Sequence, residues 1–305
     1  MNKKTKTIGC LIIITTIFIT FCFFASKNTN YNQKEQSQED NQCIFCVNDT
    51  KLTNNQNNYI IGNINEPPKI SIKNCKDKIN TIIFDGEEVY IENINQTLFD
   101  LPFLILPQHH EIKINNETFS FYYLLKDNFS LPLINGMNQT WVTPEGTNKD
   151  SWNIKNNTLY FKNNNQTGHP SLASQYKINE NFIIEFTLKL NSKNSKPIIY
   201  LLSNEDTFFF YNYELGIKSR EEQDEYIPFD FIVNQKYRIK IIRTQNTYKV
   251  FIEKDEKNVE GLYSFKSSPI FTYKKIENLS ENDYWGIGSW SNSEFEISNL
   301  IFGEY

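Results

Sequence analysis

YWGIGSWSNSEFEISNLIF (Tyr284–Phe302) is the stretch that decides the fold class of this chain. Apolar and polar residues alternate on both sides of a small polar turn, and a period of two residues is typical of half-buried β-strands. No stretch after residue 30 has a helical period over a dozen residues. The same alternation as in residues 284–302 occurs in Asn181–Leu190, Pro197–Ser203, Tyr237–Thr244 and Tyr248–Lys254. The sequence therefore predicts an all-β chain whose larger part is a β-sandwich.

Composition agrees with strands and excludes one class of partner. The chain has 305 residues, enough for about two domains. Its 24 Phe and 17 Tyr favour pleated sheets, which have room for ring side chains. The net charge is −5 and no basic stripe stands out, so we expect no nucleic-acid partner.

The N-terminus predicts a membrane segment. MNKKTK supplies three lysines, and Ile8–Ala25 is almost wholly apolar. As a helix it would rise about 27 Å, slightly less than a hydrocarbon core of roughly 30 Å. A bulky ring, Phe23, stands where a cleavage site needs a small residue. We therefore expect residues 1–26 to be an uncleaved signal anchor in the cell membrane, with the C-terminal part outside the cytoplasm; a cleaved signal peptide, and hence secretion, is the alternative.

The cysteines are interpreted in that compartment. Cys43 and Cys46 form a C-x-x-C pair, but no second pair or histidine cluster accompanies it, so zinc is not expected. In an oxidising compartment we expect a disulfide among Cys43, Cys46 and Cys75, and the sequence leaves its connectivity open.

Three segments follow the anchor. Residues 27–58 are rich in Asn, Gln, Lys and Glu, which predicts a flexible stalk. Residues 59–139 predict a small β-domain, with Asp85-Gly86 and Asn115-Asn116 as turns. Within it, LPQHHEIKIN resembles the end of PEGA-type surface modules, with His109 where a glycine is typical. Residues 140–305 predict the β-sandwich.

The sandwich segment also resembles a known family. SWNIKNNTLYF and SLASQYKINENFIIEFTLKL are similar to the opening strands of concanavalin A-like jelly rolls, and closest to the 3-keto-disaccharide hydrolase domain family. Residues 284–302 resemble the closing hairpin of that family. The resemblance spans roughly residues 150–303 and implies a jelly roll with carbohydrate binding, or a glycoside hydrolase as the alternative. The matching positions are Trp152, Asn157, Leu159, Tyr176, Asn181 and Phe182.

Two strands predict which faces are buried. In residues 182–190 the even positions are apolar, with Glu185, Thr187 and Lys189 on the other face. In residues 237–241 Arg238 and Lys240 lie opposite the apolar set. One face of each strand is expected to pack on the partner sheet and the other to reach solvent, where a saccharide or peptide can bind.

Candidate site residues follow from that arrangement. Hydrolysis of sugars needs two carboxylates, and neither a pair nor a nucleophile motif is visible, so no catalytic residue is assigned. Trp290, at a strand end, and Tyr200 are candidate sugar-stacking rings, with Glu185, Arg238 and Lys240 as polar candidates. Calcium is a candidate ion through Asp206 or Asp283, although no set of ligands is visible. The expected partner is a carbohydrate or glycoconjugate, and a protein-binding adhesion module is a further alternative.

Overall fold

The computed structural model describes residues 43–54, 57–73, 81–89, 98–101, 105–145, 147–163, 170–202, 206–219, 224–256, 262–275, 282–290 and 292–304. The chain divides into two compact units. Cys46–Ser71 and Ile79–Tyr305 form one, and the other lies mostly outside the described residues. The anchor predicted at residues 1–26 lies outside them as well. Within the described ranges, no helix has the length and apolar character to span a membrane.

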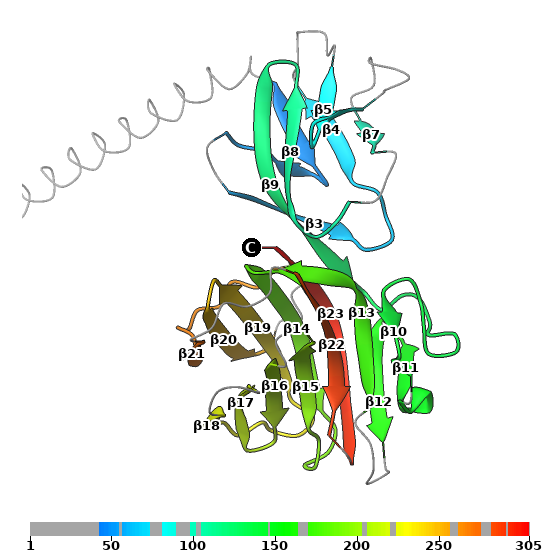
Figure 1. Cartoon of the computed structure of the whole chain (residues 1–305), viewed down its shortest axis with the longest axis vertical. Helices are drawn as coiled ribbons and strands as arrows, with labels where there is room; N and C mark the ends of the chain where they lie inside the picture. Colours follow the sequence, from blue (N-terminus) through cyan, green and yellow to red (C-terminus); the bar gives the residue numbers. More distant parts are fainter. Residues whose placement is uncertain are drawn as a thin grey trace, which may run out of the picture. The chain divides into compact units, whose positions relative to one another are not determined.

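A seven-stranded sheet forms one layer of the sandwich (Figure 1). Its printed registers are all antiparallel. In spatial order the strands are β10 (Trp141–Val142), β13 (Ser171–Asn179), β22 (Asn282–Ser289), β15 (Pro197–Leu201), β16 (Asp206–Tyr211), β17 (Glu214–Lys218) and β18 (Glu225–Pro228).

A larger sheet forms the other layer and continues into the N-terminal part of the chain. Its main path is β21 (Phe271–Lys274), β20 (Thr247–Lys254), β19 (Lys236–Thr244), β14 (Phe182–Leu190), β23 (Ser293–Glu304), β9 (Glu117–Asp127), β8 (His109–Ile114), β5 (Ile82–Phe84) and β6 (Glu87–Glu88). The hairpin of β11 (Trp152–Lys155) and β12 (Thr158–Asn163) joins it at β23, and β3 (Asn58–Asn63) pairs in parallel with β9. A short 3₁₀ helix, η1 (Lys149–Ser151), precedes β11.

A third, four-stranded sheet contains residues from the expected stalk. Its order is β2 (Thr50–Lys51), β1 (Ile44–Val47), β4 (Lys69–Lys73) and β7 (Leu98–Asp100). The prediction of a flexible stalk at residues 27–58 is therefore wrong from residue 44 onward. Val47 and Leu52 are buried, so a few apolar side chains order a segment whose overall composition is polar.

The core between the two large sheets consists of aromatic and branched side chains. The Phe186 and Phe210 rings meet edge to face at 5.9 Å, and those of Trp285 and Phe302 at 5.0 Å. Both contacts join a strand of one sheet to a strand of the other. The predicted apolar face of residues 182–190 is confirmed, because Phe182, Ile184, Phe186, Leu188 and Leu190 are all at most 1% exposed. The predicted β-sandwich is therefore confirmed.

The closing stretch differs from the predicted hairpin. β22 lies in the seven-stranded sheet, whereas β23 lies in the larger one (Figure 1). The connection crosses from one layer to the other, and the Trp290 carbonyl there accepts hydrogen bonds from Ser289 Oγ and Ser293 Oγ, both 2.8 Å. A period of two shows that each strand buries one face, and two strands facing each other across a core satisfy it as well as a hairpin does.

Strand β9 connects the regions expected to be separate domains. Its first part pairs with β8, and its last residues pair with β23, for example Asp127 with Leu300. Asp127 also accepts hydrogen bonds from Trp141 Nε1 and from the Phe129 amide, both 2.7 Å. Residues 59–139 and 140–305 therefore share a sheet, and the boundary at residue 139 stays a prediction.

Asparagine supplies many of the turns. Eight of the twelve described non-glycine residues with positive φ are Asn, a residue that tolerates the left-handed region. Asn156 and Asn157 have φ of 51° and 56° and connect β11 to β12, as expected of a two-residue type I′ hairpin. The turn predicted at Asp85-Gly86 is confirmed by the pairing of β5 with β6.

The cysteines differ in state. Cys43 is disulfide-bonded, whereas Cys46 is a free thiol and buried. A Cys43–Cys46 bond is thereby excluded. Cys75 lies outside the described residues, so its pairing with Cys43 stays a prediction.

Candidate functional site

The outer face of the seven-stranded sheet carries the candidate site. Residues opposite each other on paired strands share a face. Trp285 and Phe210 face the core, so the alternate positions Gly286 and Phe209 face outward. The registers place Tyr200 beside Gly286, and Ile198 between Gly288 and Phe209. The outward set on the central strands is Ser171, Ala173, Ile198, Tyr200, Phe209, Tyr211, Gly216, Gly286 and Gly288.

Glycines on this face make room for the neighbouring side chains to lie across the sheet. A Cβ on Gly286 would stand 2.3 Å from the Tyr200 hydroxyl oxygen, and one on Gly216 would stand 2.7 Å from Cζ of Phe209. The rings therefore occupy space that any other residue would fill. A ring that lies along a sheet presents its flat surface outward, and this is the surface that packs on an apolar partner.

Trp290 packs on a small cluster at one end of this face. The cluster consists of Ile198, Phe209 and Tyr211, all buried, with Trp290 partly exposed. A Tyr211–Trp290 hydrogen bond links the two side chains. Lys218 Nζ lies 5.5 Å from the centre of the Trp290 ring, and Lys196 Nζ 5.7 Å from that of Tyr211. Aromatic rings, hydroxyls and ammonium groups therefore lie together here.

The two phenols on this face are neutral over the ordinary pH range. Burial raises the pKa of Tyr200 to about 12. Burial, followed by the nearby Glu214 charge, raises the pKa of Tyr211 still further. Neutral hydroxyls both donate and accept hydrogen bonds, which suits a ligand that carries hydroxyl groups.

Exposed rings extend the aromatic surface. Tyr226 is 64% exposed and lies opposite Gly216, so it shares the outward face. Tyr284 is 43% exposed, lies opposite Lys177, and has the Lys177 ammonium 4.8 Å from its ring centre. The sequence had pointed to Tyr200 and Trp290 but not to these two tyrosines or to the glycines between them.

Glu185, Arg238 and Lys240, the other predicted site residues, lie elsewhere. They belong to β14 and β19 of the larger sheet, and their face does not reach solvent as predicted. Glu185 and Arg238 are 0% exposed, and Thr187 is 2% exposed. The structure thus does not bring them together with Tyr200 and Trp290. Side chains without exposed surface cannot touch a ligand in this conformation.

A later segment of the chain explains this burial. The Tyr263 amide donates to Glu185 Oε1 at 2.8 Å, and Lys240 Nζ donates to the Tyr263 carbonyl at 2.8 Å. Glu185 also pairs with Lys240 Nζ at 3.0 Å and lies 3.7 Å from Arg238 Nε. Burial raises the pKa of Glu185, although Lys240 and these hydrogen bonds lower it in part. The arrangement is a buried ion cluster that fastens residues 262–267 to the sheet.

Asp206, one of the two calcium candidates, does not fit a calcium site. It is 0% exposed, and its carboxylate bonds Lys275 Nζ at 2.9 Å and the Tyr248 hydroxyl at 2.8 Å. An ammonium already occupies the position a cation would take. The side chain of Asp283 lies outside the described residues, and no group of three or more metal-ligating side chains occurs within them.

Two of the three histidines lie in a strand rather than in loops as expected. His110 is 3% exposed, with Nδ1 2.6 Å from Asp85 Oδ2 and Nε2 2.9 Å from the Leu106 carbonyl. Both ring nitrogens are engaged, so the pair fastens β8 to the turn after β5 and leaves no nitrogen for proton transfer. His169 lies outside the described residues.

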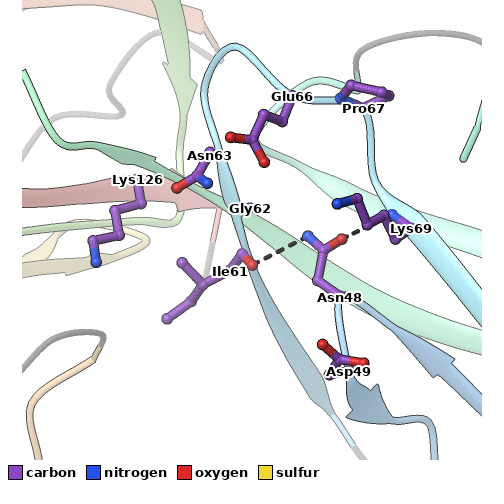
Figure 2. A pocket seen from close by; sticks show the side chains of 9 residues that line it. All are labelled: Asn48, Asp49, Ile61, Gly62, Asn63, Glu66, Pro67, Lys69 and Lys126. Carbon is purple, nitrogen blue, oxygen red and sulfur yellow. Dashed lines mark hydrogen bonds between the residues drawn. The ribbon is translucent and has the colours of Figure 1, made fainter. Parts of the chain in front are cut away.

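Two cavities open on the described surface. The smaller, of about 260 Å³, lies beside β3 and β9 (Figure 2). In it Asn48 Nδ2 donates to the Ile61 carbonyl at 3.2 Å, and Asn48 Oδ1 accepts from the Lys69 amide at 2.8 Å. Asn48 therefore completes the structure rather than offering groups to a ligand. The larger, of about 430 Å³, lies between η1, the β11–β12 hairpin and the start of β23.

Comparison with known proteins gives the fold class. No family model matches the sequence, and no curated protein matches it. Among solved structures, the chain is similar to the carbohydrate-binding module CBM66 from Bacillus subtilis, with 11% identity and a TM-score of 0.40 over 54% of this chain and 96% of that one.

Two further solved structures are similar at the same level. The Ca²⁺/Man3GlcNAc-bound exoplasmic/lumenal domain of VIP36 has 10% identity and a TM-score of 0.42 over 54% of this chain and 85% of that one. A family 16 glycosyl hydrolase protein from Mycobacterium smegmatis has 10% identity and a TM-score of 0.41 over 58% and 98%. All three are concanavalin A-like sandwiches, the class that the sequence resembles. Such identities concern the fold alone, so a ligand has to be argued from the residues of this chain.

Proposed function

We propose that this chain binds carbohydrate or glycoconjugate through the outer face of its seven-stranded sheet. The observation that carries the proposal is the partly exposed Trp290 on its aromatic cluster, on the same face as Tyr200, Tyr226 and Tyr284. Sugar rings have apolar C–H faces that stack on aromatic rings, and a few fixed polar groups orient them. Tyr200, Tyr211 and the neighbouring lysines supply such groups.

The site is further proposed to lie outside the cytoplasm, held at the membrane by residues 1–26. Two observations support this placement. The N-terminal segment is apolar behind three lysines. Cys43 is disulfide-bonded, and disulfides persist in oxidising compartments outside the cytoplasm.

Hydrolysis is the less supported alternative. It requires two carboxylates about 5–9 Å apart across a sugar bond. Among the described side chains of β15–β18 the carboxylates are those of Asp206, Glu214 and Glu225. Asp206 is buried in the core, and only Glu214, opposite Tyr211, shares the aromatic face. The described part of this face therefore supports binding rather than bond cleavage.

A glycan array probed with the full-length chain in detergent tests the proposal. We expect binding to a defined set of glycans, lost in Trp290→Ala and kept in Trp152→Phe, a matched change at a core tryptophan that is 5% exposed. The array is run with Ca²⁺ and with EDTA, because the Asp283 side chain is not described. No binding to any glycan would overturn the proposal and favour a protein-binding module, and product release in a parallel turnover assay would favour the hydrolase.

A further inference from the structure

The larger cavity has the properties of a second ligand site, on the other sheet from the aromatic face. Its volume of about 430 Å³ is within the range of small-molecule sites, roughly 300–1,000 Å³. It shares no residue with the proposed carbohydrate-binding face. Its lining is Asp150, Ser151, Asn153, Lys155, Asn156, Tyr160, Phe161, Lys162, Asn191 and Glu294.

Two polar atoms on its wall have no hydrogen-bond partner. Ser151 is 4% exposed, and its Oγ has none. Asn191 Oδ1 likewise has none, although Asn191 Nδ2 donates to Glu296 Oε1 at 2.9 Å. Since a carboxylate accepts only from the amide nitrogen, this bond fixes which atom of Asn191 faces the cavity. Buried polar groups are nearly always paired, so each of these atoms calls for a partner from outside the protein.

The charges on the wall balance. Asp150 and Glu294 carry two negative charges, and Lys155 and Lys162 two positive ones. Lys162 Nζ already pairs with Glu294 Oε2 at 3.3 Å. Neither an anion nor a cation is therefore favoured. The remaining groups are amides, a hydroxyl and the half-buried ring of Tyr160, which lies opposite Asn153 on the hairpin.

We propose that this cavity binds a neutral sugar ring. The Oγ of Ser151 and Oδ1 of Asn191 would bond its hydroxyls, and the Tyr160 ring would pack on its apolar face. An acceptor, a hydroxyl and an aromatic surface around a neutral space match a polyhydroxylated ring better than a peptide, whose hydrogen-bonding groups are spread along an extended backbone. The inference goes beyond the proposed function and does not depend on it.

Ser151→Ala tests the proposal. The probes are glucose, galactose, mannose and N-acetylglucosamine, titrated into the full-length chain by isothermal calorimetry. We expect at least one to bind, and to bind about three- to tenfold more weakly in Ser151→Ala, the effect of one lost neutral hydrogen bond. The free energy of unfolding should not fall, because the hydroxyl has no partner to lose within the protein.

Ser71→Ala is the matched control. Ser71 is 6% exposed, its Oγ also lacks a partner, and it lies in β4, away from the cavity. It should leave sugar binding unchanged. If none of the four sugars binds, or if Ser151→Ala binds them like the unaltered chain, the cavity holds water only and the proposal is overturned. Trp290→Ala separates the two sites, since it should leave binding in this cavity intact.

Discussion

The hydroxyl of Tyr200 lies where a side chain at residue 286 would begin, 2.3 Å from a Cβ built on Gly286. The glycine thus determines how the tyrosine lies on the proposed binding face. Gly286→Ala should displace the Tyr200 ring and press on the Leu172 carbonyl, 2.5 Å from the same Cβ. We expect unfolding free energy to fall by about 1–3 kcal/mol, measured by urea denaturation.

The pair can be separated by a double-mutant cycle. In a Tyr200→Ala background, Gly286→Ala should cost less, because one of its two clashes is gone. An equal cost in both backgrounds would show that Tyr200 does not lie on the glycine.

Lys218 should be a cover over the Trp290 ring rather than a ligand-binding group. Its ammonium lies 5.5 Å from the ring centre, on a side chain that is exposed. A sugar that stacks on that side of the ring must first displace it, at a cost of about 0.5–1 kcal/mol for an exposed cation–π contact. Lys218→Ala should therefore bind array-identified glycans as tightly or up to about fivefold more tightly, by calorimetry. Weaker binding would mean that the ammonium itself contacts the sugar.

Asp127 should be a major contributor to stability where β9 meets β10. Its carboxylate accepts from Trp141 Nε1 and the Phe129 amide, and it is 5% exposed. Asp127→Ala leaves two buried donors unsatisfied, which should cost roughly 2–4 kcal/mol in urea denaturation. Asn128→Ala, one residue on, is the control and should change the unfolding free energy by less than about 0.5 kcal/mol. Similar costs for both would contradict the account of this contact.

The pH dependence of stability should show the burial of Glu185. Burial raises the pKa of this carboxyl above its model value of 4.5, so the folded chain holds the proton more tightly than the unfolded chain. Its contribution to stability is then greatest below about 4.5 and declines as pH rises through the raised pKa. The unaltered chain should gain stability relative to Glu185→Gln as pH is lowered from neutrality to that value. A relative loss on acidification would show that Arg238 and Lys240 outweigh desolvation.

Much of the fold could be predicted because the strands carry a clear period of two. The buried set from Phe182 to Leu190 could be read directly from the sequence, as could the turns at Asp85-Gly86 and Asn156-Asn157. Which sheet a strand joins could not, since β22 and β23 have the pattern of a hairpin yet pair with different partners. The period also says nothing of what packs on the second face of a strand. Glu185 is covered by Tyr263, 78 residues later in the chain.

The candidate site was only partly visible in the sequence. Trp290 and Tyr200 stand out as rings near strand ends. The alternation of Gly286 and Gly288 with Trp285 and Ile287 was a readable signal of a face without side chains, onto which neighbours can lie. The larger cavity left no such signal, because Ser151, Asn191 and Glu294 come from three separate segments that only the fold brings together.

The most direct test of carbohydrate binding on this face follows the four tryptophan indole N–H resonances by NMR. A glycan identified on the array would be added to the full-length chain. Trp141, Trp152 and Trp285 are at most 5% exposed, and Trp290 alone is partly exposed. We predict that the Trp290 resonance shifts with glycan concentration while those of Trp141 and Trp285 do not. Binding that leaves Trp290 unmoved would contradict the proposal that this face is the carbohydrate site.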